Sequence, residues 1–149
     1  MSSYIAYTDG GARGNPGPAG SGAVITDSSG TILKKAHKAL GIATNNYAEY
    51  TAVILALDTL KKMIPQSDRK TAKIDMRMDS ELVVRQLNGI YQIKEETLFP
   101  LFIKIHNARV ADFPNITFTH IPREKNKLAD EMSNVAMDES EGKTPGSLF

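Results

Sequence analysis

The sequence predicts an α/β fold, with one mixed β-sheet and α-helices packed on its faces. Three strand-like stretches come first, and strand and helix patterns alternate after them, as expected when a hairpin sheet is extended by parallel strands. A length of 149 residues suits one domain with a single core, and no internal repeat or long linker divides the chain. The predicted element order is therefore β-β-β-α-β-α-α-β-α.

The N-terminal part begins with three predicted strands. Residues 4–8 are rich in aromatic and β-branched side chains and end at the turn-forming Asp9-Gly10-Gly11. Residues 10–22 hold six of the eleven glycines and two prolines, so we expect a loop there. Strands at 22–26 and 31–40 then flank a hairpin turn made of Asp, Ser and Gly.

Helix and strand patterns alternate in the rest of the chain. From Thr44 to about Met63 apolar residues recur with a helical period, which predicts a helix. Residues 72–78 alternate between apolar and polar side chains and predict a strand that ends at Asp79. We further expect a helix at 80–87, a helix at 100–112, a strand at 115–121 and a helix at 124–138. These elements form one domain over residues 1–138, followed by a mobile tail at 139–149.

Composition excludes several classes of function. A hydrophobic content of 41% with 23% charged residues is typical of a globular protein, and a net charge of +1 indicates no polyanionic or membrane partner by itself. The absence of cysteine excludes disulfides, thiolate zinc sites and cysteine nucleophiles. No apolar run approaches a membrane span, and the N-terminus lacks the features of a signal peptide, so we expect a cytoplasmic protein.

Two carboxylates follow predicted strands. Asp9 comes after the first strand and Asp79 after the strand at 72–78, so the two acids lie side by side if these strands are parallel neighbours. The alternative interpretation is that Asp simply favours strand ends and turns.

Glu49 favours the functional interpretation. It shares a helical stripe with apolar residues, where a carboxylate is costly unless a proton, a basic partner or a metal ion neutralises it. No Lys or Arg occurs between Gly41 and Leu60. Asp130, near the start of the last helix, is a fourth candidate, although an acid there also complements the helix dipole. Converging carboxylates predict an oxygen-ligand site for Mg²⁺ or Mn²⁺, and two such ions can cleave a phosphodiester.

Other chemistries have little support in the sequence. The glycine-rich stretch contains neither a dinucleotide-binding fingerprint nor a P-loop, and no nucleophile elbow is present. Paired carboxylates also serve glycosidases, but the chain has no tryptophan to form a sugar platform.

Four stretches, in order, resemble the motifs of type 1 ribonuclease H. They are YTDGGARGNPGPAG at 7–20, TNNYAEY at 44–50, DSELV at 79–83 and HIPREKNKLAD at 120–130. The resemblance covers the chain from about Tyr4 to Met137. It implies the ribonuclease H fold, a five-stranded mixed sheet with helices on both faces. It also implies an endonuclease that hydrolyses the RNA strand of RNA–DNA hybrids to 5′-phosphate and 3′-hydroxyl ends.

The resemblance also assigns roles to individual residues. Two Mg²⁺ ions, replaceable by Mn²⁺, are expected on four metal-binding carboxylates, which are Asp9, Glu49, Asp79 and Asp130. The resemblance implies that Asp9 bridges both ions. His120 matches the family's mobile histidine, which assists water handling or product release. Contacts to RNA backbone and 2′-hydroxyls are implied for Asn15, Asn45 and Asn46, and a DNA-phosphate contact for Thr44. We expect a monomer without an obligatory protein partner or a membrane association.

The sequence differs from some relatives between the third motif and the following helix. Many members carry a basic, tryptophan-bearing protrusion there, whereas residues 88–100 are few and contain only Lys94 as a base. We also expect no N-terminal hybrid-binding module. Weaker, salt-sensitive binding of the hybrid follows, because few phosphates are neutralised. Lysines and arginines at 34–38 and 123–127 either compensate for the missing phosphate contacts or form an ordinary solvated surface.

Two alternative functions stay open at this point. One is a catalytically silent module that binds hybrids, although it would require a missing acid and all four are present. The other is a nuclease of the same superfold that acts also or instead on duplex RNA, which a fold alone cannot exclude.

Overall fold

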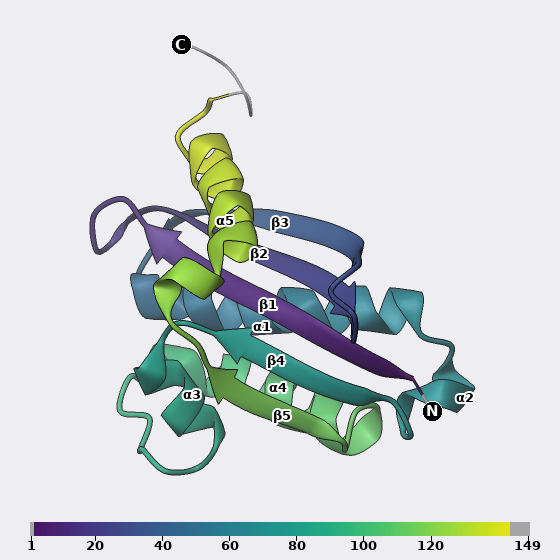
Figure 1. The fold of residues 1–149 in the computed structure, drawn as a ribbon. Helices are drawn as coiled ribbons and strands as arrows, with labels where there is room; N and C mark the ends of the chain where they lie inside the picture. Colours follow the sequence, from purple (N-terminus) through teal and green to yellow (C-terminus); the bar gives the residue numbers. More distant parts are fainter. Residues whose placement is uncertain (1, 144–149) are drawn as a thin grey trace.

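The computed structural model describes residues 2–143 and contains one five-stranded mixed sheet in the order β3-β2-β1-β4-β5 (Figure 1). β1 is antiparallel to β2, and β2 is antiparallel to β3, whereas β1, β4 and β5 run parallel. The strand bounds are β1 Ser3–Ala12, β2 Gly17–Asp27, β3 Ile32–Ala43, β4 Lys73–Met78 and β5 Ile116–His120. The predicted fold class is thereby confirmed.

Helices cover both faces of the sheet (Figure 1). α1 and α4 pack on one face, and α5 crosses the other face over β1, β2 and β3. The helix bounds are α1 Asn45–Met63, α2 Gln66–Arg69, α3 Glu81–Leu87, α4 Phe99–Ala111 and α5 Lys127–Ser140, with short 3-10 turns η1 Glu96–Leu98 and η2 Arg123–Lys125. None of these helices is long and apolar enough to cross a membrane.

The core lies between α1, α4 and the sheet. The stripe predicted for α1 is fully buried at Val53, Ala56 and Leu60, which pack with Ile74 and Met76 of β4. Because the alternating residues of β4 point into this core, its register places Asp79 at the edge of the sheet, just beyond the buried Met78.

The prediction of a loop at residues 10–22 is wrong. β1 continues through Gly10 and Gly11 to Ala12, and β2 already begins at Gly17, so only a short turn separates them. Gly10, Gly20 and Gly22 serve close helix packing, whereas Gly14, with φ +96°, and Gly17 lie at the turn itself. A Cβ on Gly10 would lie 2.2 Å from the carbonyl carbon of Ala48 in α1. Since glycine alone tolerates such an approach, a glycine-rich composition here indicates strands covered directly by helices.

Replacing Gly20 with alanine tests this packing. A Cβ there would lie 2.4 Å from the Cβ of Ala136 in α5, so we expect Gly20→Ala to lower the free energy of unfolding by about 2–3 kcal/mol. Its cross-strand partner Gly11 is the matched control, because the nearest atom to a Cβ there is the flexible methyl of Met137 at 3.3 Å. Urea unfolding measures both variants. Equal losses would contradict the packing argument.

One further helix and the two ends of α5 differ from the predictions. The short helix α2 was not predicted, because four residues carry no detectable period. α5 begins at Lys127, after η2, instead of at Glu124. It also continues to Ser140, whose hydroxyl donates to the carbonyl oxygen of Ala19 in β2, so the predicted boundary after 138 falls inside a helix. Residues 144–149 of the predicted tail lie outside the described part of the chain.

Candidate active site

Three carboxylates from distant parts of the chain meet at one edge of the sheet. The parallel register pairs Tyr7 with Arg77, so Asp9 and Asp79 are level with each other on neighbouring strands. The close approach of α1 to Gly10 brings Glu49 over the same edge. One ligand oxygen from each of Asp9, Glu49 and Asp79 lies within 4.8 Å of the others.

Asp130 joins this group from the opposite face. It lies in the first turn of α5, and Asn126 at the N-cap ties that helix to β1 by donating from its side chain to the carbonyl oxygen of Thr8 at 2.9 Å. All four carboxylates line one pocket of about 380 Å³, which Arg123 and Asn45 also line. The structure thus brings together every acid that the sequence singled out.

Burial and neighbouring negative charges perturb the pKa values of Asp9 and Glu49. Burial raises the pKa of Asp9 to about 8, and the negative charges of Asp79, Asp130 and Glu49 add to the rise. Burial also raises the pKa of Glu49 to about 7, although the Ser80 hydroxyl and the charge of Arg123 act in the opposite direction. The site is therefore short of positive charge, and a proton or a cation relieves the repulsion.

The donor set fits a hard divalent cation. It consists of carboxylate oxygens alone, the ligand type that Mg²⁺ and Mn²⁺ prefer, and includes no thiol or histidine pair. The raised pKa values point the same way, because a bound cation would replace the protons that the folded protein holds there.

His120 lies at the same edge of the sheet but does not line the pocket. It is the last residue of β5 and pairs with Met78, the residue before Asp79. Its side chain is exposed. An approach to a substrate bound over the carboxylates is compatible with this placement.

Two of the asparagines predicted to contact substrate, Asn15 and Asn45, are hydrogen-bonded to each other at the pocket. The backbone N–H of Asn45, at the start of α1, donates to Asn15 Oδ1 at 3.0 Å. Asn45 Oδ1 in turn accepts from the N–H of Ala12 at 2.8 Å. Within the described part of the chain neither side-chain NH₂ group has a hydrogen-bond partner, so both are available to donate to a ligand.

The two remaining predicted contact residues have partners within the protein. Thr44 is the N-cap of α1 and accepts from the N–H of Tyr47 at 3.2 Å. Asn46 donates to Glu95 Oε1 at 3.3 Å, across a groove lined by Tyr91 and Lys94. The Asn46 amide keeps its second N–H and its oxygen for a ligand while it donates to Glu95.

Sequence reasoning missed two residues that hold the acids in place. Ser133 Oγ donates to the carbonyl oxygen of Asp130 at 2.8 Å and lies 3.4 Å from Asp9 Oδ2. Asn126 is buried and links α5 to β1. Ser133 could have been found from the sequence, because it is a polar residue at an otherwise apolar position of its helix. No comparable pattern singled out Asn126.

The fold and the acidic pocket define a nuclease-type domain with the ribonuclease H fold. A family model described as reverse transcriptase-like matches residues 7–136. The structure of LC11-RNase H1, isolated from compost by a metagenomic approach, superposes with a TM-score of 0.87 at 49% identity, covering 95% of this chain and 99% of that one. The chain belongs to the type 1 ribonuclease H family.

Two sequence relatives are longer than this chain. Ribonuclease HI of Halobacterium salinarum is 36% identical over 135 residues, which are 91% of this chain and 64% of that protein. The bifunctional protein Rv2228c of Mycobacterium tuberculosis is 40% identical over 135 residues, which are 90% of this chain but 35% of that protein. The chain therefore spans about a third of the mycobacterial relative.

Proposed function

We propose that this protein is an endoribonuclease that hydrolyses the RNA strand of RNA–DNA hybrids by a two-metal-ion mechanism, leaving 5′-phosphate and 3′-hydroxyl ends. The convergence of Asp9, Glu49 and Asp79, with ligand oxygens within 4.8 Å, is the observation that carries the proposal. Membership of the type 1 ribonuclease H family supports the reaction class.

In this proposal the carboxylates of Asp9, Glu49, Asp79 and Asp130 would hold two Mg²⁺ ions. When bound, the ions would supply Lewis acidity to the attacking water and offset negative charge on the leaving oxygen. Asp9 and Glu49 must lose their protons to act as ligands, so their raised pKa values link metal binding to pH. Asn126, at the N-cap of α5, and Ser133, within α5, tie the helix that carries Asp130 to the strand that carries Asp9.

The asparagines supply the recognition of RNA. The free NH₂ groups of Asn15 and Asn45 are donors, and the minor groove of a hybrid offers 2′-hydroxyl and base acceptors. Short polar side chains read groove shape and sugar, so we expect little sequence preference. LC11-RNase H1 has been crystallised in complex with an RNA/DNA hybrid, at 47% identity and a TM-score of 0.84 to this chain.

Parallel digests with labelled hybrid, duplex RNA and duplex DNA in Mg²⁺ test this function. We expect products from the RNA strand of the hybrid alone, with ends that carry 5′-phosphate. Preferential cleavage of duplex RNA would favour the alternative nuclease function, and tight hybrid binding without products would identify a binding module.

His120 gives a second prediction. Because it lies at the edge of the site without lining the metal pocket, His120→Ala should lower kcat by about ten- to a hundredfold without abolishing turnover. His106 is the matched control, since its exposed side chain lies on α4, away from this edge. Steady-state hybrid cleavage measures both variants. An unchanged kcat for His120→Ala would contradict its role.

Binding should be weak and salt-sensitive. The segment between α3 and η1 is short, and the groove beside it contains the cation Lys94 and the anion Glu95 together. Few phosphates are therefore neutralised, and affinity depends on the asparagine contacts and the metal ions.

A further inference from the structure

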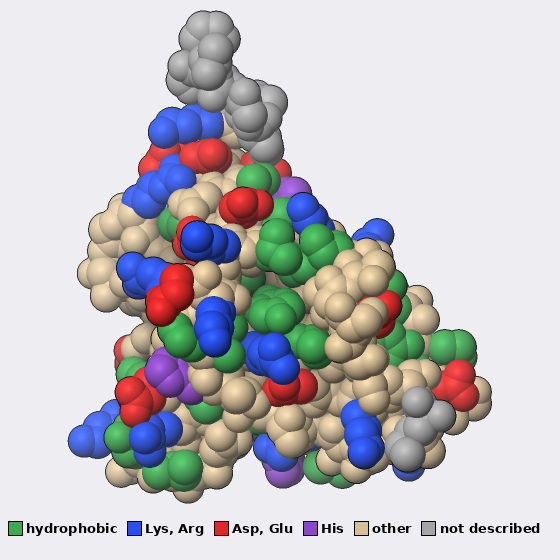
Figure 2. Space-filling view, viewed as in Figure 1, with side chains coloured by type: hydrophobic (Ala, Val, Ile, Leu, Met, Phe, Trp, Pro, Cys, Tyr) green, Lys and Arg blue, Asp and Glu red, His purple; other side chains and the backbone are tan. Residues whose placement is uncertain are grey.

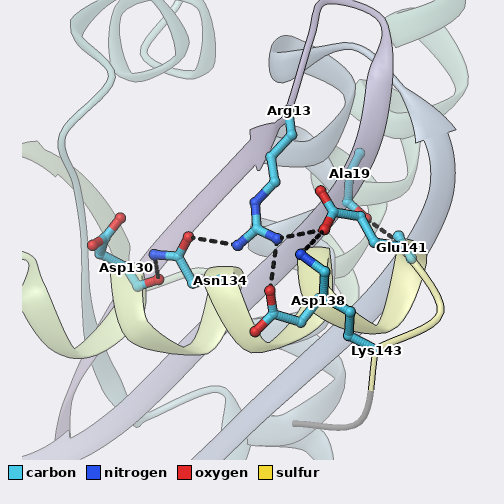
Figure 3. Close-up of polar contacts among 8 residues, drawn as sticks. Arg13, Ala19, Asp130, Asn134, Asp138, Glu141 and Lys143 are labelled. Atoms are coloured by element: carbon cyan, nitrogen blue, oxygen red, sulfur yellow. Dashed lines mark hydrogen bonds and ion pairs between the residues drawn. The ribbon is translucent and has the colours of Figure 1, made fainter. Parts of the chain in front are cut away.

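Arg13 forms a network of polar contacts between the β1–β2 turn and α5 (Figure 3). Its guanidinium Nη1 lies 2.6 Å from Asp138 Oδ1 and 3.1 Å from Glu141 Oε2, and Nη2 donates to Asn134 Oδ1 at 3.3 Å. Asn134 in turn donates to the carbonyl oxygen of Asp130 at 3.0 Å. One side chain thus links the turn to the helix that carries a candidate metal ligand.

The C-terminal end of α5 carries acidic side chains that a nearby cation would stabilise. Asp138, Glu139 and Glu141 lie at the negative end of the helix dipole, and the last turn contains no basic residue. Acids are unfavourable there, so they cost stability unless positive charge arrives from elsewhere. In the space-filling view, positive and negative side chains gather over this end of α5 (Figure 2). Arg13 is the cation that the β1–β2 turn supplies.

The same turn is fixed on its other side by α1. Asn15 accepts from the N–H of Asn45, and Asn45 accepts from the N–H of Ala12, the residue before Arg13. The turn is therefore held between α1 and α5, and Arg13 makes its side-chain contact to α5. Without the Arg13 guanidinium, the turn would keep the α1 hydrogen bonds and the backbone bond from the Arg13 N–H to the carbonyl oxygen of Pro18 at 2.9 Å, but it would lose its side-chain contact to α5.

We propose that Arg13 is a positioning residue, which fixes the β1–β2 turn against α5 so that the Asn15 amide keeps its place beside the pocket. The proposal rests on the proposed function, because Asn15 matters through substrate binding. Arg13 does not contact the substrate in this account. Its guanidinium is occupied by Asp138, Glu141 and Asn134.

Arg13→Gln tests the proposal through the split between KM and kcat. Loss of the anchor should raise KM for the hybrid about five- to tenfold, the equivalent of about one hydrogen bond, while kcat changes less than about twofold. Arg13→Lys should recover part of the loss, because it keeps the charge without the planar fork. Lys143→Gln is the matched control, since Lys143 pairs with the same Glu141 at 2.6 Å but does not hold the turn.

Salt dependence separates positioning from direct contact. If Arg13 only positions the turn, the slope of log K against log salt is the same for wild type and Arg13→Gln. A slope smaller by about one phosphate contact would instead show that Arg13 binds the backbone, and would overturn the proposal. An equal KM increase in Lys143→Gln, or an unchanged KM in folded Arg13→Gln, would overturn it as well.

Hydrogen exchange makes the test independent of catalysis. The amide N–H of Asn45, which donates to Asn15, should exchange faster in Arg13→Gln than in wild type or Lys143→Gln. If wild type fails to cleave the hybrid but this amide still loses protection, the proposed function is wrong while the anchoring role stands. Unaltered protection of the amide would contradict the anchoring role itself.

Discussion

Asp9→Asn is expected to lower the rate of RNA cleavage at least about a thousandfold, because it removes a carboxylate whose ligand oxygen lies within 4.8 Å of those of Glu49 and Asp79. Asparagine keeps the size of the side chain and one acceptor oxygen for the N–H of Gly10, so the fold is retained. Single-turnover cleavage of a labelled hybrid measures the loss, and circular dichroism checks the fold.

Asp75→Asn is the matched control for this substitution. Asp75 lies on the neighbouring strand β4, but its carboxylate pairs with Arg77 at 2.9 Å and accepts from Thr119 at 2.7 Å, outside the acidic pocket. We expect its cleavage rate to stay within about twofold of wild type. Comparable losses in both variants would show that the cleavage rate reports strand integrity and not metal ligation.

The second large effect concerns stability without metal. The folded protein holds a proton on Asp9 up to a pKa of about 8, whereas the unfolded chain releases it near 3.8. Because the native state binds more protons in this range, the contribution of Asp9 to stability is highest below the unfolded pKa, falls as pH rises and levels off above about 8. Glu49, whose pKa is raised to about 7, acts in the same direction.

Asp9→Asn should therefore stabilise the metal-free protein at high pH. We expect a gain of about 2 kcal/mol in EDTA at pH 8 and almost none at pH 4, where wild-type Asp9 is already neutral. Added Mg²⁺ should stabilise wild type more than the variant, since only wild type retains the full ligand set. Urea unfolding at both pH values provides the measurement. A gain that is independent of pH would exclude charge repulsion as its cause.

Much of the site was predictable because its chemistry is local in sequence. Glu49 stood out as an unpartnered carboxylate on an apolar stripe, and the structure places it over the pocket. The alternation of residues 72–78 was enough to place Asp79 at a strand end, and β4 ends at Met78. The order of the four motifs identified Asp130 as a candidate ligand. Its position in the helix alone was equally well explained by an acid that complements the helix dipole.

The glycine-rich stretch shows what local propensity misses. It was predicted as a loop because glycine favours turns, but the packing of α1 and α5 reverses that preference at Gly10, Gly20 and Gly22. Arg13 was missed for a related reason. Its partners Asp138 and Glu141 lie more than a hundred residues away, and no local spacing encodes such a contact.

A titration of the hybrid cleavage rate with Mg²⁺, starting from EDTA, tests most directly whether the carboxylate pocket is a metal-dependent nuclease site. We expect no cleavage in EDTA, a rate that rises with Mg²⁺, and a weaker Mg²⁺ requirement as pH increases toward 8 and Asp9 and Glu49 ionise. Cleavage that persists undiminished in EDTA, or its absence at every Mg²⁺ concentration, would contradict the account.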